Sequence, residues 1–232
     1  MRVAIMQPYF MPYIGYFQLI NAVDVFVIYD DVNYIKKGWI NRNTILVNNK
    51  SFLFSVSLKD ASQNKLINEI SVSDVNKWKK DLLKTLNLSY KKAPFYADVF
   101  PMLERIISFE ESNLAAYIMY SIQELCDYLK IDTQLVRSSE IGKNNDLKGE
   151  SKIIDICVKL NASEYINAIG GMELYTKSHF MEKKINLHFL KSENIAYKQF
   201  KDEFRPWLSI IDVIMFNSIE ESRKFLNKFE LI

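Results

Sequence analysis

Two apolar runs near the start of the chain constrain its fold most strongly. The first covers residues 2–6, and the second, residues 24–29, is rich in β-branched and aromatic side chains. Both patterns are typical of buried strands. Between them, Pro8 and Pro12 prevent a helix, because proline lacks an N–H group and pushes the residue before it out of the α region. The chain therefore leaves its first strand through a loop.

A helix is expected to connect this loop to the second strand. From Tyr13 onward, apolar residues recur at roughly helical spacing over about ten positions. A helical crossover joins parallel strands, so the unit predicts an α/β fold with a parallel-sheet core and additional helices. No linker, repeat or low-complexity segment divides the chain, and we expect one domain over residues 1–232.

The rest of the chain supplies further strands and helices. Two apolar runs flank Asn48 and Asn49, which tolerate positive φ angles, and this pattern predicts a β-hairpin. Residues 133–160 repeat the order strand, loop, helix. Further strands are expected over residues 165–167 and 186–190. Helix starts are indicated by Pro101 in a first turn and by caps at Ser112 or Asn113, at Ser209 and at Ser218.

The ligand site is expected beyond the carboxyl ends of the first two strands, where open α/β sheets bind ligands. Gly15 lies in the first helical turn, where the lack of Cβ would let a phosphate or carboxylate approach the N–H groups. A plain solvated loop is the alternative for residues 30–42, because charged residues usually face water. The substrate-binding candidates are Gln7, Pro8, Tyr9, Tyr13, Gly15, Tyr16, Trp39 and Asn41, and the catalytic candidates are Asp30, Asp31, Lys36, Lys37 and Arg42.

Weaker candidates lie further along the chain. Asn167, Gly170 and Gly171 follow a predicted strand end, where paired glycines allow close approach of a ligand or of another segment. Arg205 beside Trp207 suits an anion or a sugar, or simple stacking on the indole. Lys143, Lys148, Gly149 and Ser151 precede a predicted helix, and an ordinary helix entry is the preferred interpretation there.

Composition excludes several classes of protein. The chain is 49% hydrophobic and 25% charged, without the roughly 18 successive apolar residues that membrane insertion requires. The start of the chain lacks the pattern of a signal peptide, so a cytoplasmic protein is expected. A net charge of +2 gives no case for duplex nucleic acid. Two histidines, His179 and His188, offer little material for a catalytic triad or zinc site, and no metal ligand is assigned.

Several segments resemble a known family. The run IMQPYFMPYIGYFQLI, followed by DVFVIYDDVNYIKKGWINRN, is similar to the N-terminal signature of the WbqC-like family, bacterial proteins found in O-antigen and surface-sugar gene clusters. NASEYINAIGGMELY and FRPWLSIIDVIMFN resemble other recurrent stretches of that family, so the likeness spans nearly the whole chain. Family members also carry a similar Tyr-x-Lys-x-Pro segment, which makes Tyr90 and Lys92 candidates, with a structural turn as the alternative.

The resemblance implies a role in O-antigen or lipopolysaccharide biosynthesis, as a transferase of glycine or a related acyl group. The implied partners are a nucleotide-linked amino sugar and a small carboxylate or acyl donor. The alternative is a non-catalytic protein that binds a nucleotide-sugar or glycan, since aromatic side chains stack on sugars. The sequence identifies no cofactor and gives no indication of oligomeric state.

An ATP-dependent route rests on an analogy of position. In HIGH-type nucleotidylyltransferases of the HUP class, a helix after the first strand opens with H-x-G-H, and Tyr13-Ile14-Gly15-Tyr16 occupies the comparable place. That route would require ATP with magnesium. Lys36, Lys37 and Arg42 would then neutralise the phosphates, and Asp30 or Asp31 would accept a proton or hold the metal.

Overall fold

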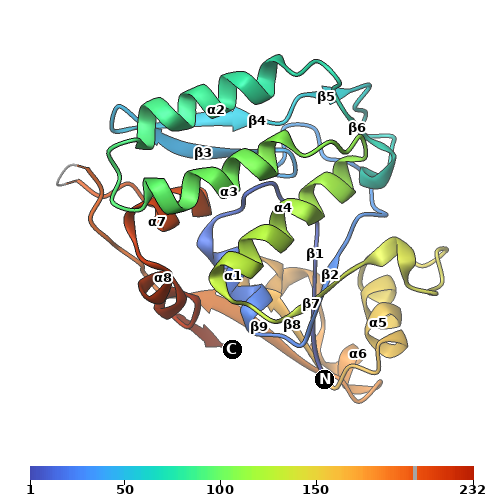
Figure 1. The fold of residues 1–232 in the computed structure, drawn as a ribbon. Coiled ribbons are helices and arrows are strands. Elements are labelled where there is room, and N and C mark those ends of the chain that lie inside the picture. Colours follow the sequence, from blue (N-terminus) through green and yellow to red (C-terminus); the bar gives the residue numbers. More distant parts are fainter. Residues whose placement is uncertain (201–202) are drawn as a thin grey trace.

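The N-terminal unit has the predicted order. The computed structural model describes residues 1–200 and 203–232. It contains β1 (Arg2–Met6), α1 (Ile14–Asn21) and β2 (Val25–Ile28), with β1 and β2 parallel and Val3 opposite Val25. The expected α/β fold with a parallel core is confirmed for the described residues (Figure 1).

Six strands form the main sheet. The order is β10-β9-β8-β1-β2-β7, built from β7 (Gln134–Arg137), β8 (Glu164–Ala168), β9 (Asn186–Ser192) and β10 (Phe229–Leu231) in addition to the first two strands. Strand β10 is antiparallel to β9 and was not predicted, because three residues carry too little periodicity. The chain moves outward from β1 to β7 and then returns to the other side of β1 with β8. Strands β1 and β8 therefore flank a topological switch point.

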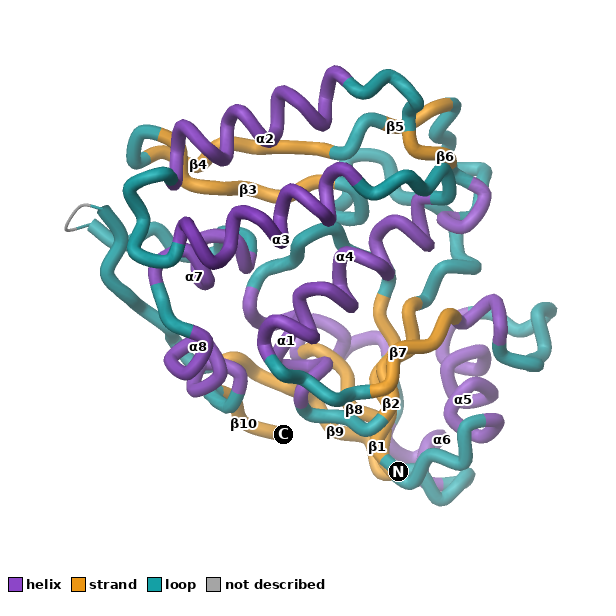
Figure 2. The backbone as a smooth tube through the Cα atoms, in the orientation of Figure 1, coloured by secondary structure: helices purple, strands orange, loops and turns teal. Residues whose placement is uncertain are grey.

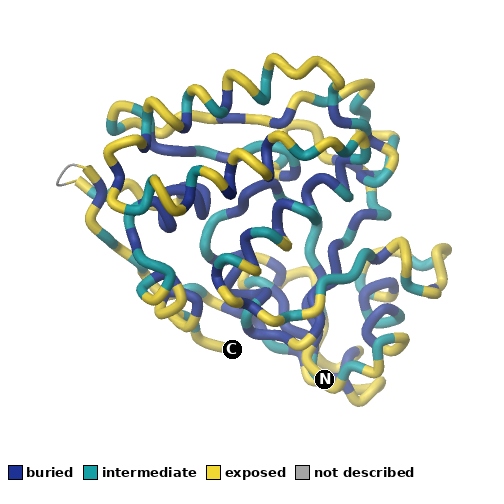
Figure 3. Tube along the Cα trace, viewed as in Figure 1, coloured by how far each residue is buried: buried dark blue, intermediate teal, exposed yellow. Residues whose placement is uncertain are grey.

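Helices cover both faces of the sheet. On one face, Ala4 and Phe26 pack with α1, α4 (Leu114–Leu129) and α8 (Ile219–Leu226). On the other face, Val3 and Val25 pack with α5 (Gly149–Lys159) and α6 (Lys177–Met181). Successive strand residues point to opposite faces, so strands that are covered twice are apolar throughout. Figure 3 shows buried central strands and exposed outer sides of the helices.

A long insertion separates β2 from α4. It contains β3 (Arg42–Val47), β4 (Lys50–Ser55), β5 (Leu58–Lys59), β6 (Ser71–Val72), α2 (Lys77–Tyr90) and α3 (Tyr96–Ser108). The predicted hairpin is confirmed, since β3 and β4 pair across Asn48 and Asn49, which have φ angles of 49° and 60°. Figures 1 and 2 show the insertion beyond the carboxyl ends of β1 and β2.

Three predicted helix caps are confirmed and one predicted helix start is wrong. The side chain of Asn113 caps α4, Ser209 caps α7 (Ile210–Phe216), and Ser218 caps α8, each by accepting a backbone N–H bond. Pro101 was expected in a first turn, but it lies inside α3, which begins at Tyr96. Its ring occupies an exposed position of the helix, so the missing N–H falls on the solvent side.

Buried Gln18 ties α1 to the last part of the chain. Its Nε2 donates to the carbonyls of Phe225 and Lys228 at 2.8 and 2.9 Å, and its Oε1 accepts from the hydroxyl of Ser192. The amide is thus fully satisfied inside the core. Among the described helices, none combines the length and hydrophobicity needed to cross a membrane.

Candidate functional site

A hollow of about 330 Å³ lies where β1 and β8 end. We call it the switch-point pocket. Met6 is the last residue of β1 and Ala168 is the last residue of β8. Both line the pocket, as expected for a ligand site of a doubly wound sheet. The first turns of α1 and the loop after β2 complete it. Its lining consists of Met6, Gln7, Pro8, Tyr9, Tyr13, Gly15, Tyr16, Leu19, Ile35, Gly38, Trp39, Ile40 and Ala168.

Two loops that are distant in sequence meet at this pocket. The N–H of Phe10 donates to the carbonyl of Ile40 at 2.9 Å, which fixes the two loops against each other. The rings of Tyr9 and Trp39, which come from these two loops, lie side by side with their centroids 6.3 Å apart. The expected meeting of the Gln7 loop and the Trp39 loop at one end of the sheet is therefore observed.

Gly15 makes room for a tyrosine ring. A Cβ at Gly15 would lie 2.3 Å from Cε2 of Tyr13, closer than side-chain carbons approach. The close neighbour is thus part of the protein, where the sequence had suggested a ligand. The N–H groups of Ile14 and Gly15 still lie in the first turn of α1, where no intrahelical acceptor is available to them. Gly15 lines the pocket, so an anion there would lie near its N–H group and near the positive end of the helix dipole.

Hydroxyl groups in the pocket stay protonated. The hydroxyl of Tyr16 donates to the carbonyl of Gln7 at 2.9 Å. Burial raises the pKa of Tyr16 well above its usual value, and burial together with Tyr13 raises the pKa of Tyr9. The lining formed by the described residues carries no carboxylate, lysine, arginine or histidine. The pocket suits flat rings and neutral hydrogen-bonding groups.

The chain is similar to a known family of proteins. The model of the WbqC-like protein family matches residues 7–224. The chain belongs to the WbqC-like protein family. An uncharacterised protein of Mycobacterium tuberculosis is 30% identical to it over 229 residues, which cover 97% of this chain and 97% of that protein. No solved structure matches significantly.

Asp30 and Asp31, the two carboxylates predicted for the site of this WbqC-like chain, lie outside the pocket lining. Asp30 is fully buried and accepts hydrogen bonds from the hydroxyl of Ser138 at 2.9 Å and from the N–H and hydroxyl of Ser139 at 2.9 and 2.7 Å. The reason is topological, because β2 pairs with β7 and not with β8. The residue after β2 therefore meets the residues after β7.

Asp31 is held by two lysines. Nζ of Lys143 lies 2.7 Å from its Oδ2, and Nζ of Lys152 lies 3.1 Å away. Burial alone would raise the pKa of this carboxyl, but hydrogen bonds from both lysines and from Ser138 outweigh it and hold the pKa below its ordinary value. We call Asp30, Asp31, Ser138, Ser139, Lys143 and Lys152 the charged cluster.

The cations of the 30–42 loop flank the pocket without lining it. Lys36 and Lys37 are exposed on the turn between Ile35 and Gly38, two lining residues. The guanidinium of Arg42 lies 5.5 Å from the centre of the Trp39 ring and donates to the carbonyl of Lys37. It therefore holds the turn and the indole in place.

Asn41 also has a structural role. Its Nδ2 donates to the carbonyl of Val56 at 2.9 Å, and its Oδ1 accepts from the hydroxyl of Tyr34 at 2.8 Å. Both ends of the amide are used within the protein. The sequence placed Asn41 in the site because it is polar and near Trp39, but these contacts direct it toward β4.

Tyr90 and Lys92 are separated from the pocket and from each other. Tyr90 is buried, and its hydroxyl accepts from the N–H of Leu46 and donates to Asp212, both at 2.9 Å. Lys92 is exposed beside Asn48 in a shallow hollow near the β3–β4 turn. The two residues are close in sequence, but α2 ends between them, so they face different surroundings.

The four candidates at the end of β8 and further along the chain have mixed roles. Oδ1 of Asn167 accepts from the N–H of Ala168 at 2.9 Å, and a Cβ at Gly171 would lie 2.3 Å from Nδ2 of Asn167. Gly171 is therefore a packing glycine, whereas Gly170 faces open space. Arg205 is exposed and pairs with Glu203 at 3.0 Å. These four candidates do not line the pocket.

The sequence did not predict the apolar residues that line the pocket. Leu19, Ile35 and Ile40 look like ordinary core or loop residues in sequence, and Ala168 joins the site only because β8 lies beside β1. Ile35 and Gly38 flank the predicted Lys36 and Lys37, so proximity to a predicted loop was the available signal.

Magnesium does not fit the pocket. Mg²⁺ is usually held through one or two carboxylates, and the described lining contains none. Within residues 1–200 and 203–232, no three His, Cys, Asp or Glu side chains are grouped to hold a metal ion.

Proposed function

We propose that the switch-point pocket binds a nucleotide-linked sugar. The observation that carries this proposal is an uncharged, aromatic pocket at the switch point of a doubly wound sheet, next to the first turn of a helix. The aromatic rings and the helix start match the two chemical parts of such a ligand, its rings and its phosphates. Rings stack on a base or sugar, and the N–H groups of the helix start face a phosphate.

The surroundings support this ligand class. A volume of about 330 Å³ is at the lower end of the range of roughly 300–1,000 Å³ common for small-molecule sites, so the pocket would hold one ring system and the rest of a nucleotide-linked sugar would extend past its opening. Trp39 is 51% exposed, so part of its ring is available to a ligand. Lys36 and Lys37 beside the opening add positive charge for a diphosphate without filling the pocket.

The proposed use of this ligand is acyl or aminoacyl transfer, with glycine as one donor, onto the amino group of the sugar during surface-polysaccharide synthesis in the cytoplasm. Membership of the WbqC-like family supports this step. The HUP analogy is supported by the position of α1 directly after β1.

Non-catalytic binding of a nucleotide-sugar is the second candidate. It is favoured by one observation, since burial raises the pKa values of Tyr9 and Tyr16 and thereby keeps them from acting as bases near neutral pH.

Calorimetry with ATP and with UDP- and dTDP-linked amino sugars tests the binding step. We expect at least one of the nucleotide-linked sugars to bind and to raise the melting temperature, because a ligand of the native state stabilises it. Trp39→Ala should weaken binding by about 1–3 kcal/mol, the usual value of one stacking contact. Phe52→Ala is the control, since Phe52 is similarly exposed on β4 and lies outside the pocket. No binding by any nucleotide-linked sugar, or unchanged binding by Trp39→Ala, would overturn the proposal.

Product analysis separates the two candidates. The protein is incubated with the bound nucleotide-linked amino sugar, ATP and labelled glycine, and the amide product is sought by mass spectrometry. A second reaction supplies glycine as a preformed thioester, and a third measures exchange of labelled pyrophosphate into ATP. Amide formation supports the transferase. Tight binding with no transfer from either donor selects the non-catalytic protein.

A further inference from the structure

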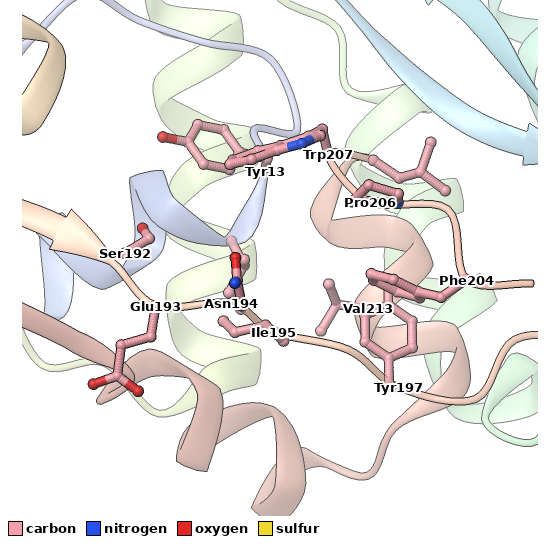
Figure 4. A pocket seen from close by; sticks show the side chains of 12 residues that line it. Tyr13, Ser192, Glu193, Asn194, Ile195, Tyr197, Phe204, Pro206, Trp207 and Val213 are labelled. Carbon is pink, nitrogen blue, oxygen red and sulfur yellow. The ribbon is translucent and has the colours of Figure 1, made fainter.

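A second, smaller cavity shares a wall with the switch-point pocket. It has a volume of about 80 Å³ and lies between α1, the segment after β9 and the start of α7. Tyr13 lines both cavities. Figure 4 shows Tyr13 and Trp207 along one side of the smaller cavity and Phe204 and Tyr197 along another. We call these four residues the aromatic cage.

The rings of the cage come in two pairs. The centroids of Tyr13 and Trp207 are 6.1 Å apart, and those of Tyr197 and Phe204 are 5.0 Å apart. The ring planes within the pairs are tilted by 60° and 72°, and all four residues line the cavity. The face of an aromatic ring carries partial negative charge and attracts cations.

Trp207 is held in an unusual conformation. Its φ angle is 62°, in the left-handed region that bulky residues rarely adopt, and it is 74% exposed. A strained and exposed tryptophan gains little from core packing. Such outliers concentrate at ligand sites, where the surrounding structure holds a side chain in place for binding.

A buried carboxylate lies directly behind the cage. Oδ1 of Asp212 accepts from the hydroxyl of Tyr197 at 2.7 Å and from Nε2 of Gln199 at 2.6 Å. Its Oδ2 accepts from Tyr90 at 2.9 Å. The hydroxyl of Tyr90 already accepts from the N–H of Leu46, so its own proton points to Asp212. Three donors fit the ionised carboxylate, which accepts only.

The charge of Asp212 is not balanced by a cation in the described structure. Its three donors are neutral, and within residues 1–200 and 203–232 neither lysine nor arginine forms a salt bridge with it. Burial raises the pKa of Asp212, against the effect of the hydrogen bonds. A positive charge in the cage would favour the ionised form. Glu193 adds a second carboxylate at the edge of the cavity.

We propose that the aromatic cage binds a small organic ammonium group. The ring faces and the carboxylate behind Tyr197 favour a cation over a neutral group of the same shape. Size limits the occupant, because an engineered cavity of about 150 Å³ holds benzene and this one has about half that volume. On that scale about three to four non-hydrogen atoms fit, which corresponds to an amine on a short carbon skeleton.

The position of the cage assigns a role to the ammonium group. Because Tyr13 separates the two cavities, a group in the cage lies next to the ligand of the switch-point pocket. We assign the cage to the amino group of a second substrate, and this role rests on the proposed function. Binding of an ammonium group does not rest on it, since the cage and Asp212 form a site by themselves.

A matched pair of probes tests the proposal. Isopropylammonium and 2-propanol have the same shape and number of non-hydrogen atoms, and only the first is cationic at neutral pH. In the wild-type protein we expect isopropylammonium to shift the indole resonance of Trp207 with a Kd on the order of 1–10 mM. 2-Propanol should bind at least about fivefold more weakly, because the cation–π attraction is missing. Equal binding, or no shift with either probe, would overturn the proposal.

Two variants locate the cause, with binding measured by saturation-transfer NMR. Trp207→Leu keeps an apolar side chain on an exposed position and should remove most of the preference for the cation. Asp212→Asn keeps the shape of the side chain and should bring the two probes to nearly equal affinity. If Asp212→Asn does not fold, Trp207→Leu still decides, and a preference unchanged by it would overturn the proposal. If the wild type binds no nucleotide-linked sugar but still prefers the cation, only the proposed function is overturned.

Discussion

The carboxyl edge of one sheet contains two contrasting regions. At the ends of β1 and β8 lies the switch-point pocket, which is hollow and whose described lining is uncharged. At the ends of β2 and β7 lies the charged cluster, whose polar atoms bond to one another. Sequence reasoning expected one site at this edge, with Asp30 and Asp31 as catalytic candidates beside the Gln7 loop. The structure shows that charge at a strand end and an open site at a strand end are separate properties.

The difference follows from strand order. Adjacent strands β2 and β7 bring their following residues together, so Asp30 reaches the serines and Asp31 reaches the lysines. The side chain of Lys143 is only 1% exposed, and a buried charge needs a partner. At the switch point the connections leave β1 and β8 in opposite directions, which leaves a gap. The charged cluster stabilises the fold, and the switch-point pocket is left for a ligand.

Asp31→Asn should have the largest effect on stability. It leaves two buried lysines without their carboxylate, and breaking a buried ion pair in this way costs about 3–5 kcal/mol. Urea unfolding measures the loss. Glu230→Gln is the control, because its pair with Lys191 is exposed on both sides and solvent screens it, so its loss should change stability little. A loss no larger than that of the control would contradict the stabilising role of the charged cluster.

The same carboxylate predicts how stability depends on pH. The pKa of Asp31 is lowered in the folded protein from its ordinary value of 3.8, so its contribution is present above that value and is lost as the pH falls through the lowered pKa. Between pH 5 and about pH 2, the wild type should therefore lose more stability than Asp31→Asn. Chemical denaturation at a series of pH values provides the comparison, and parallel curves would exclude the effect.

Trp39→Ala should show the opposite behaviour to Asp31→Asn. Trp39 is half-exposed, so truncation should change stability by less than about 1 kcal/mol while nucleotide-sugar affinity falls. Asp31→Asn should leave affinity unchanged at a temperature where it is folded. Calorimetry and urea unfolding on both variants give a two-by-two test. Loss of affinity in both variants would merge the two regions into one site.

Gly15→Ala tests whether Tyr13 couples the two cavities. The new Cβ would meet the tyrosine ring at 2.3 Å and displace it, while alanine favours the helix by up to about 1 kcal/mol. We expect little change in melting temperature and weaker binding both of nucleotide-sugar and of isopropylammonium. Gly142→Ala is the matched control, because a Cβ there meets open space. If Gly15→Ala weakens only one ligand, the shared wall does not couple the sites.

The double variant Lys36→Ala/Lys37→Ala should have the smallest effect. Both side chains are exposed and outside the lining, so they act on a ligand phosphate only through solvent. Affinity should fall a few-fold at low salt and recover the wild-type value near 0.5 M salt, where screening acts within about 4–5 Å. Calorimetry at two salt concentrations measures this, and a salt-independent loss would indicate direct contact.

The fold was predictable where local chemistry decides it. The prolines after β1, the paired asparagines of the hairpin and the capping side chains of Asn113, Ser209 and Ser218 act on neighbouring residues, and the structure confirms each. Strand β10 and the start of α3 depend on packing against distant segments. Strand order is equally non-local, and it decides which loops meet.

The site was predictable in part for the same reason. Tyr9, Tyr13 and Tyr16 lie within one local unit, and Trp39 was correctly placed at the same end of the sheet. Asp30 and Asp31 were misplaced because their partners, Ser138 and the two lysines, come more than a hundred residues later. Ionisable residues attract attention in a sequence, although their neighbours determine whether they are available.

The central place of β1 has a consequence for the order in which the chain is made. Strand β1 is synthesised well before its second neighbour in the sheet, β8, which begins with Glu164, opposite Arg2. The buried amide of Gln18 is completed later still, by the carbonyls of Phe225 and Lys228. Until β8 has been synthesised, the nascent strand β1 therefore has one free edge, which is a template for pairing with other chains. Early holding by a chaperone would protect it, and truncation just before β8 should give an aggregating fragment.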